Sequence, residues 1–319
     1  MRLFKSNSKK HEAVQFYIEP PKTKAAGDGI AIAVLVKNEA ASIGEWLRFH
    51  RIAGVDTFIL YDDGSTDATL ATAYDTVGRD ALIVIPWAQR IQDAAHKRAI
   101  HNQGMAFAHA IGNFRQEFRW MGFIDIDEFL FPTQANNLLE VLGHLAHVDN
   151  ILLPWQMFGR QGFVETPEHI LPNYVQRYRC PFEAKVKGLL NFKCLVNPLK
   201  VTKAYVHGFE TNGNQTIWNS AGKEFQFGTH RSPEFEKATA LQLNHYYIKS
   251  DAQLAEKTDK GSIGDSTFTS AFKTRSSREK MLVSRLAEIE RDVIEDRQII
   301  DFCARAGIDY PPKTQNKIG

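Results

Sequence analysis

The 319-residue sequence predicts an α/β protein with a mostly parallel, Rossmann-like central sheet flanked by helices. The first observation is that apolar runs typical of buried strands alternate with helical stretches through the first half of the chain. The second is that polar clusters follow directly on several of these runs, where strands of a parallel sheet would end. The third is that from Ile151 onward short apolar runs are separated by turns, which predicts an antiparallel extension of the sheet.

The predicted elements of the first half follow a polar N-terminal arm, residues 1–28. Ile30–Val36 is a continuous run of apolar and β-branched residues, as expected for a strand buried on both faces. Ser42 is placed to cap the helix that follows, and Gly54 is placed to end it. Further along, we predict strands at 57–61, at 81–85 and from 120 onward, and helices at 68–74 and 94–114.

The second half is expected to complete the sheet and to end in a long helix. Antiparallel strands are predicted by the short apolar runs at 151–153, 189–196, 201–206 and 241–248. Lys257–Lys273 is rich in Gly, Ser and Thr, which predicts a mobile loop. Ser276 or Ser277 then caps a helix that continues to about Ala306, and Gly307 is placed to end it.

Composition and charge are those of an ordinary globular protein. The hydrophobic share is 43%, the charged share 24% and the formal net charge only +2, so no global field favours nucleic acid or an acidic membrane as a partner. The three cysteines form no CxxC pair, which argues against a disulfide framework and a zinc site. No apolar segment follows the basic residues 1–10, so we expect no secretory signal, and no apolar stretch approaches the length of a bilayer. We therefore expect a cytoplasmic protein without a transmembrane segment, able to contact the inner face of the membrane peripherally.

The motif with the strongest chemical signal is Asp125-Ile126-Asp127-Glu128, which has apolar runs on both sides. Carboxylates in such surroundings are costly to bury unless a positive group lies against them. Alternation along a strand puts Asp125 and Asp127 on the same face, where the pair can bind one divalent cation or a cation-bound phosphate. Oxygen ligands favour Mg²⁺ or Mn²⁺. We expect Asp127 on the metal, Asp125 on the metal or on a ribose or sugar hydroxyl, and Glu128 in support of the loop.

Two further polar clusters end predicted strands and should converge with this motif on one crevice. Lys37-Asn38-Glu39 ends the first strand, and Asp62-Asp63 ends the second. A carboxylate in such a place can accept a hydrogen bond from a base N–H or a ribose hydroxyl, and Lys37 can contact a phosphate. Both clusters are also compatible with a plain turn or a helix cap. We include all of them among the predicted substrate-binding residues.

The second half offers a late-chain metal ligand and two donor-binding candidates. His245 lies near the end of an apolar run and is the first candidate to join Asp127 on the metal, with His207 as the alternative. For any single such histidine a structural role is favoured. The aromatic face of Trp155 suits the apolar face of a hexose, and Lys257 can neutralise a diphosphate as a point charge.

Taken together, these motifs resemble a known family. The resemblance is carried by Ala33–Glu39, Tyr61–Asp67, Trp120–Phe129, Trp155-x-x-Phe158-Gly159, Val206-His207 and Asn244-His245-Tyr246. In this order they are similar to the glycosyltransferase family 2-like group that resembles glycosyltransferase family 92, over residues 30–260. The resemblance implies a GT-A fold, a nucleotide-sugar donor, a divalent metal on the Asp-x-Asp motif and inversion at the anomeric carbon. It also implies that Asp63 contacts the nucleobase, Asp125 the donor ribose or sugar and Asp127 the metal.

The resulting hypothesis is a metal-dependent, inverting glycosyltransferase that moves a hexose from a nucleoside diphosphate sugar, with UDP favoured, to a glycan or glycolipid acceptor, as in polysaccharide biosynthesis. The domain would span 29–260, with 29–150 as the nucleotide-binding half, 151–260 as the acceptor half and 261–319 as a loop and C-terminal helix. As general base we rank Glu165 before Glu210 and Asp265, because it follows the glycine loop closely. The alternatives are a phosphohydrolase of the haloacid dehalogenase type and a non-catalytic sugar-nucleotide-binding protein.

Overall fold

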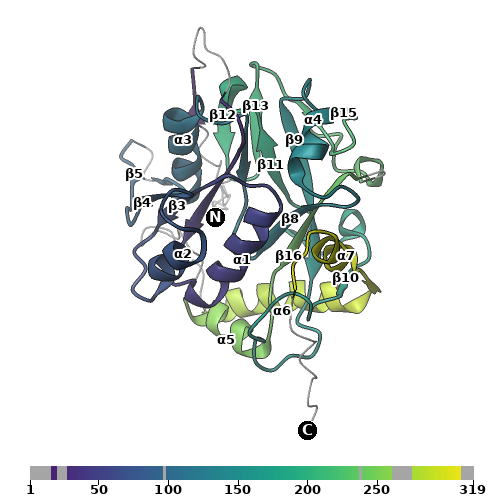
Figure 1. The fold of residues 1–319 in the computed structure, drawn as a ribbon. Helices are drawn as coiled ribbons and strands as arrows, with labels where there is room; N and C mark the ends of the chain where they lie inside the picture. The colour runs from purple at the N-terminus through teal and green to yellow at the C-terminus, as the bar shows by residue number, and fades with distance from the viewer. Residues whose placement is uncertain (1–15, 20–26, 96–97, 237–238, 261–274, 310–319) are drawn as a thin grey trace, which may run out of the picture.

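The computed structural model describes residues 16–19, 27–95, 98–236, 239–260 and 275–309. Its centre is one large mixed sheet with helices packed against it (Figure 1), which confirms the predicted α/β class. The strands of this sheet are β2 (Ile30–Val36), β3 (Thr57–Asp62), β4 (Leu82–Pro86), β7 (Trp120–Phe123), β8 (Glu128–Pro132), β9 (Asn150–Phe158), β10 (Gln176–Tyr178), β11 (Phe192–Val196), β14 (Thr216–Trp218), β15 (Glu224–Gln226), β16 (Leu241–Tyr246) and β17 (Val293–Glu295).

The main path of the sheet runs in the order β15-β14-β9-β11-β7-β2-β3-β4. Its parallel part is built by the first half of the chain, because β2 pairs in parallel with β3 and β7, and β3 pairs in parallel with β4. Every residue of β2 is buried, as its unbroken apolar run predicted for a strand covered on both faces.

The helices of the first half cover the two faces of this parallel part. One face carries α1 (Ala40–Ile52), α2 (Thr69–Val77) and α4 (Leu138–His144), whose apolar side chains share one buried cluster with alternate residues of β2. The other face carries α3 (Asn102–Phe114), which contributes Phe107 and Ile111 to a second cluster. The core therefore lies in two layers, one on each side of the sheet.

Two boundaries in this half differ from the prediction. α1 begins at Ala40 with Glu39 at the N-cap, so Ser42 lies inside the first turn and does not cap the helix. α3 begins at Asn102 and not near residue 94, because the preceding residues form a hairpin of β5 (Gln92–Asp93) and β6 (Arg98–Ala99). The Asp93 side chain accepts the Ala95 N–H at 2.9 Å, which favours a turn over a helix there.

The second half forms the antiparallel extension that the sequence predicted. β11 inserts between β7 and β9 and is antiparallel to both, whereas β16 pairs antiparallel with β8 and parallel with β9. A smaller sheet has the order β1-β12-β13, made of β1 (Phe16–Tyr17), β12 (Val201–Tyr205) and β13 (Gly208–Thr211). Residues 16–17 of the predicted arm thus add a strand to this sheet. Short 3₁₀ turns lie at Pro181–Glu183, Pro198–Lys200 and Pro233–Phe235.

The C-terminal region differs from the prediction of one loop and one uninterrupted helix. α5 (Asp251–Lys260) is helical where the loop was expected to begin, and the rest of that loop lies outside the described residues. α6 (Arg275–Arg291) is the predicted long helix, but its continuation to Ala306 is wrong. The chain leaves the helix because β17, which starts with two β-branched residues, pairs with β10 before α7 (Gln298–Arg305) begins. Gly307 follows α7 at a φ of 69°, as its predicted terminating role requires.

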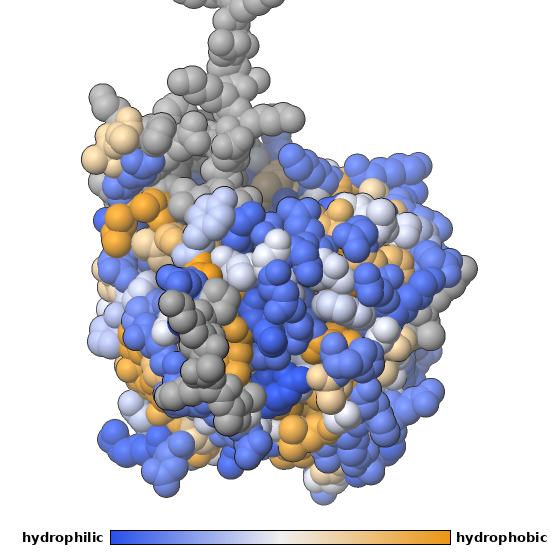
Figure 2. Space-filling model, turned by 90° about the horizontal axis from the view of Figure 1, so that it is seen from above, coloured by the Kyte–Doolittle hydropathy of each residue, from blue (hydrophilic) through white to orange (hydrophobic). Residues whose placement is uncertain are grey.

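The face of the molecule seen from above in Figure 2 is mostly hydrophilic, and its apolar residues form separate patches between polar ones. Among the helices that the structure describes, none combines the length and the apolar character that crossing a bilayer requires.

Candidate functional site

The polar clusters that follow β2, β3 and β7 lie at one edge of the sheet, because these neighbouring strands are parallel. Lys37 Nζ lies 3.7 Å from Asp63 Oδ2, which joins the ends of β2 and β3. Asn38, at a φ of 54°, accepts the Thr66 N–H at 2.7 Å through its side-chain oxygen and donates its own N–H to Ser65. The predicted convergence of the first two clusters is therefore present, with Asn38 tying the two loops together.

Asp63 is the buried acid of the second cluster, with a side chain only 1% exposed. Arg90 donates to its two oxygens from two nitrogens, Nη1 to Oδ1 at 2.6 Å and Nη2 to Oδ2 at 2.8 Å. Asn102 Nδ2 adds a third hydrogen bond at 3.2 Å. Asp62 has a different use, because its Oδ1 accepts the Ser65 N–H at 3.0 Å within the turn. Of the two acids, Asp63 is the one held at the sheet edge beside Lys37.

The Asp-x-Asp motif forms a turn and not a strand. β7 ends at Phe123 and β8 begins at Glu128, so the expectation that strand alternation aligns Asp125 and Asp127 is wrong. The Glu128 carboxylate accepts the Asp125 N–H at 2.9 Å, and the Glu128 N–H donates to the Asp125 carbonyl at 3.1 Å. Trp46 Nε1 donates to the Glu128 carbonyl at 2.7 Å. Glu128 therefore supports the turn, as expected, and the turn gives each aspartate its own partners.

Asp125 is held by one residue from α3 and one from β11. Gln103 Nε2 donates to Oδ1 at 2.5 Å, and Lys193 Nζ donates to Oδ2 at 2.8 Å. The Lys193 side chain is fully buried on β11. Burial by itself lowers the pKa of Lys193, but the carboxylates of Asp125 and Glu128 outweigh it and raise the pKa above its usual value. A carboxylate held in this way is fixed in orientation, and its side chain stays 31% exposed toward the edge of the sheet.

Asp127 lies between a histidine and a lysine. Its Oδ1 is 3.4 Å from His245 Nε2 and its Oδ2 is 3.2 Å from Lys257 Nζ. β16 positions the histidine, since His245 is in register with Glu128 and the Tyr246 N–H donates to the Asp127 carbonyl at 2.9 Å. Burial by itself raises the pKa of Asp127, but the charges of Lys257 and His245 outweigh it and hold the pKa well below its usual value. Asp127 is therefore an ionised carboxylate at neutral pH.

The donor set at Asp127 fits a small divalent cation. Ligand atoms at about 2.1 Å from an octahedral metal and at right angles to each other are about 3 Å apart, and Asp127 Oδ1 and His245 Nε2 are separated by 3.4 Å. One carboxylate oxygen and one imidazole nitrogen are acceptable ligands for Mn²⁺ or Mg²⁺, with phosphate oxygens and water completing the shell. In the described part of the chain no cluster of three acidic, histidine or cysteine ligands exists. His245 Nδ1 is buried and has no hydrogen-bond partner among these residues.

Trp155 separates the surroundings of the two aspartates. Its ring lies 4.3 Å from the ring of His245 and 5.5 Å from that of His207, measured between centroids. His207 Nδ1 donates to the Phe192 carbonyl at 3.2 Å, and burial together with the charge of Lys193 lowers its pKa to about 4. His207 thus shares its surroundings with Lys193 on the Asp125 side, and of the two predicted histidines it is His245 that lies against Asp127.

Several residues of this region were not singled out from the sequence. Lys193 interrupts the apolar run 189–196, and Lys249 follows directly on the run 241–248, so a charge within or beside a buried strand was the available signal. The side chain of Lys249 is buried, and its Nζ donates to Ser42 Oγ at 3.3 Å. Glu39, on the same side, has a pKa raised to about 7 by burial and by the charge of Asp127, against the opposing charges of the nearby lysines. Arg90 and Gln103 gave no signal, because only the fold brings them to the acids.

The candidate general bases lie elsewhere in the structure. Glu165 is exposed in the segment between β9 and β10, where the carbonyls of Phe163 and Val164 accept the first N–H groups of α5. Glu210 is occupied by Lys203 Nζ at 2.9 Å, with Tyr205 and Gln215 also donating to it. Asp265 lies outside the described residues. The segment that carries Glu165 therefore contacts the start of α5, the helix on which Lys257 lies.

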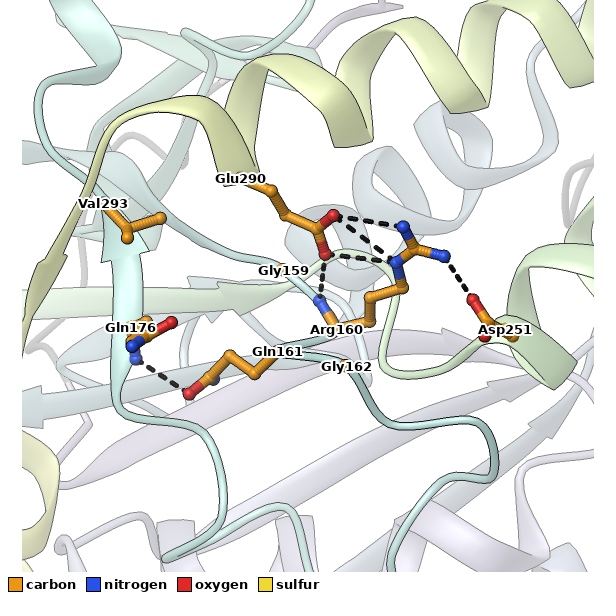
Figure 3. Close-up of a pocket in the computed structure, with 8 residues that line it drawn as sticks. All are labelled: Gly159, Arg160, Gln161, Gly162, Gln176, Asp251, Glu290 and Val293. Carbon is orange, nitrogen blue, oxygen red and sulfur yellow. Dashed lines mark hydrogen bonds and ion pairs between the residues drawn. The ribbon is translucent and has the colours of Figure 1, made fainter. Parts of the chain in front are cut away.

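A cavity lies away from both aspartates, at the end of β9 (Figure 3). It has a volume of about 340 Å³ and is lined by Gly159, Arg160, Gln161, Gly162, Gln176, Asp251, Glu290 and Val293. Arg160 donates to Glu290 at 3.2 Å and also pairs with Asp251, so that β9, α5 and α6 meet at its guanidinium. This cavity holds none of the sheet-edge acids, and the ion pairs of Arg160 in its lining tie β9 to α5 and α6.

Comparisons with known proteins agree with the motifs. The chain is 25% identical over 159 residues to a glycosyltransferase family 92 protein of Oryza sativa subsp. japonica, covering 48% of this chain and 25% of the relative. It is 26% identical over 137 residues to a family 92 protein of Arabidopsis thaliana, covering 41% and 21%. The chain thus spans about a quarter of the length of the curated relatives it matches.

Solved structures match this chain more distantly. Staphylococcus aureus TarS 1–349 in complex with UDP has a TM-score of 0.32 and 17% identity, covering 53% of this chain and 47% of that one. Glucosyl-3-phosphoglycerate synthase of Mycobacterium tuberculosis, in complex with Mn²⁺, UDP and glucosyl-3-phosphoglycerate, has a TM-score of 0.26 and 21% identity, covering 42% and 45%. At such scores neither structure adds to the description of the site. The sequence model of glycosyltransferase family 92, by contrast, matches residues 30–296, and the chain therefore belongs to glycosyltransferase family 92.

Proposed function

We propose that this chain transfers a hexose from a nucleoside diphosphate sugar, with UDP as the favoured nucleotide, to a glycan or glycolipid acceptor, with inversion and with a divalent metal. The observation that carries the proposal is the group of Asp127, His245 and Lys257 at the carboxyl edge of the parallel strands, with contacts of 3.4 and 3.2 Å around one ionised carboxylate. In a chain of a glycosyltransferase family, this is where a metal-bound diphosphate is expected.

Asp127 and His245 are the residues that would hold the metal, Mn²⁺ or Mg²⁺, with Asp125 in the neighbouring position of the turn. The metal would supply Lewis-acid stabilisation of the departing diphosphate. Lys257 is placed to add a positive charge on the same side, since its ammonium is already within 3.2 Å of the metal-binding carboxylate.

The remaining acids would orient the donor. Asp63, held on both oxygens by Arg90, keeps a fixed acceptor surface for a base N–H or a ribose hydroxyl, with Lys37 beside it for phosphate. Asp125 is held by Gln103 and Lys193 so that its exposed part can accept from a sugar or ribose hydroxyl. Because these carboxylates are already oriented by their partners, binding the donor would need little reorganisation.

Fewer contacts support the roles of Trp155 and Glu165 toward the sugar and the acceptor. Trp155 lies between the two histidines and is only 7% exposed, so it would present no more than a small part of its ring to the hexose. Glu165 is the proposed general base, which would take the proton of the acceptor hydroxyl as that oxygen attacks the anomeric carbon. Its side chain is exposed, so it would reach the acceptor only from the segment that packs on the start of α5.

A donor-turnover assay tests the proposal. The wild-type chain with Mn²⁺ should hydrolyse or transfer the sugar of a nucleotide sugar, and Asp127→Asn should lose this activity while keeping its melting temperature. Release of phosphate from generic phosphomonoesters, with no turnover of nucleotide sugars, would favour the phosphohydrolase alternative. Nucleotide-sugar binding without turnover, over a broad set of acceptors, would favour a non-catalytic binding protein. The cytoplasmic location with peripheral membrane contact stays a prediction.

A further inference from the structure

Lys249 lies in the segment 247–250 that links β16 to α5, and it is buried although it carries an ammonium group. The residue is only 4% exposed. Among the described residues its Nζ makes one hydrogen bond, to Ser42 Oγ at 3.3 Å. An ammonium group has three donors, so one neutral hydroxyl leaves it largely unsatisfied. Burying a charge in this state is unfavourable unless another group completes its surroundings.

Lys249 faces the same acid as Lys257. Burial lowers the pKa of Lys249, and the carboxylates of Asp127, Glu39 and Glu45 act in the opposite direction. Lys257 contacts Asp127 directly, whereas within the described part of the chain Lys249 has no carboxylate at ion-pair distance. Two ammonium groups therefore lie near Asp127, and among the described residues only Lys257 is at ion-pair distance from it.

The balance of charge in this group favours an anion. Asp127 and Glu45 can offset the charges of Lys249 and Lys257, and a bound divalent cation would then leave this group with a positive excess. Glu39, whose pKa burial raises to about 7, does not supply a full counter-charge near neutral pH. A donor diphosphate would supply the missing negative charge. It gains one further negative charge when the bond to the sugar breaks, so that the cations stabilise the products of cleavage more than the intact donor.

We propose that Lys249 and Lys257 form a pair of cations that bind the diphosphate of the donor, an inference that rests on the proposed function of the site. In the transfer step, the bond between the anomeric carbon and the β-phosphate oxygen breaks, and its electron pair passes to that oxygen. The acceptor oxygen forms the new bond to carbon and loses its proton to the general base. Neither lysine exchanges a proton, and both interact with the charge that develops on the diphosphate. Lys249 is held for this by Ser42 in the first turn of α1.

A purely structural lysine and a diphosphate-binding lysine respond differently to removal of the charge. If Lys249 stabilises the fold through its contacts, Lys249→Met should lower the melting temperature. If it is held for a ligand, Lys249→Met removes an incompletely satisfied buried charge, so the melting temperature should stay the same or rise. Lys249→Gln is the second variant, since an amide can still donate to Ser42 Oγ and lacks only the charge.

The experiment is isothermal titration of the whole chain, in Mn²⁺, with inorganic pyrophosphate, UDP and UMP. The variants are Lys249→Met, Lys249→Gln and Lys257→Met, and the matched control is Lys280→Met, an exposed lysine on α6. We expect each of the first three to weaken pyrophosphate and UDP by about tenfold or more, as for loss of one charge-assisted contact. UMP should change by less than about threefold. The control should bind like wild type.

Unchanged UDP and pyrophosphate binding in both Lys249 variants would overturn the inference. Lys249 variants with a lowered melting temperature and with equal losses of affinity for UDP and UMP would also overturn it. A Lys249→Gln variant that binds both UDP and pyrophosphate like wild type would do the same. If wild type binds pyrophosphate through the two lysines but binds no nucleotide, the cation pair is supported and the proposed function fails. If wild type binds neither, both fail together.

Discussion

Arg90 holds Asp63 through both ends of its guanidinium group, with N–O distances of 2.6 and 2.8 Å. The residues come from different parts of the chain: Asp63 follows β3, and Arg90 follows β4 and precedes the β5–β6 hairpin. A bidentate pair restrains rotation of the carboxylate as well as neutralising it. The Asp63 carboxylate is thus held in one orientation at the sheet edge, whereas without Arg90 it could rotate.

Arg90→Lys should weaken nucleotide binding more than it weakens the fold. A lysine keeps the charge beside Asp63 but lacks the second nitrogen, so the carboxylate is free to rotate. We expect about a tenfold loss of affinity for UDP, measured by titration, with little change in the melting temperature.

Arg90→Met should cost stability as well, because it leaves the buried Asp63 carboxylate with only Asn102 and the more distant Lys37 as partners. A loss of about 1–3 kcal/mol in the free energy of unfolding is expected for an unsatisfied buried group. Denaturant unfolding measures it, and the double variant Arg90→Met with Asp63→Asn should recover most of the loss. A double variant no more stable than Arg90→Met would mean that the pair is not what holds this loop.

Removing either proposed metal ligand should abolish Mn²⁺ binding without unfolding the chain. Asp127→Asn and His245→Gln keep the size of each side chain but lose a charge or a nitrogen ligand. Electron paramagnetic resonance of free Mn²⁺ during titration, in the presence of UDP, measures the bound fraction. Glu279→Gln, an exposed acid on α6, is the control and should bind like wild type. Undiminished Mn²⁺ binding by Asp127→Asn would show that the metal does not bind at this site.

Glu165→Gln tests the proposed base. If Glu165 takes the acceptor proton, kcat should fall by about 10²–10⁴-fold, while UDP binding stays unchanged because, among the described residues, Glu165 has no hydrogen bond or ion pair to the acids that would orient the donor. Glu210→Gln should leave kcat unchanged if its hydrogen bonds to Lys203 and Tyr205 are purely structural. A Glu165→Gln enzyme with wild-type kcat would exclude Glu165 as the base.

Acid should destabilise the fold through His50. This fully buried histidine donates from Nδ1 to the Trp46 carbonyl at 2.9 Å and accepts the Leu130 N–H at Nε2, so the folded state requires the neutral ring. Burial lowers its pKa to about 3. Since the unfolded chain protonates near pH 6.5, stability is complete above that pH and is lost progressively below it.

For His50 alone the loss between pH 7 and pH 5 should be about 2 kcal/mol. Urea unfolding at a series of pH values measures it, and His50→Gln should show a correspondingly shallower dependence on pH in this range. His207 and His230, whose pKa values burial lowers to about 4, act in the same direction and remain in the variant as a common background. A pH dependence identical in wild type and His50→Gln would contradict the prediction.

Much of the fold of residues 29–150 could be predicted because its information is local. Ile30–Val36 is a seven-residue strand with the predicted bounds, since a β-branched run of that length suits only a strand covered on both faces. The sheet-edge position of Lys37 and Asp63 followed from parallel strands ending at one edge. The predicted C-terminal helix is wrong beyond Arg291, where α6 ends. Val293 and Ile294 continue a helical apolar spacing, but they pair as a strand with β10, which lies more than a hundred residues earlier in the chain.

The sequence by itself determined which residue types stand at the carboxyl ends of the strands, because hydrophobic period and strand ends are local properties of the chain. Only the tertiary structure decided which charges meet there. It bent Asp125 and Asp127 into a turn, brought Lys193 of β11 to the first, and brought His245 of β16 and Lys257 of α5 to the second. The physical reason is that an ion pair acts over a few ångströms in space, and the order in which strands join a sheet sets those distances.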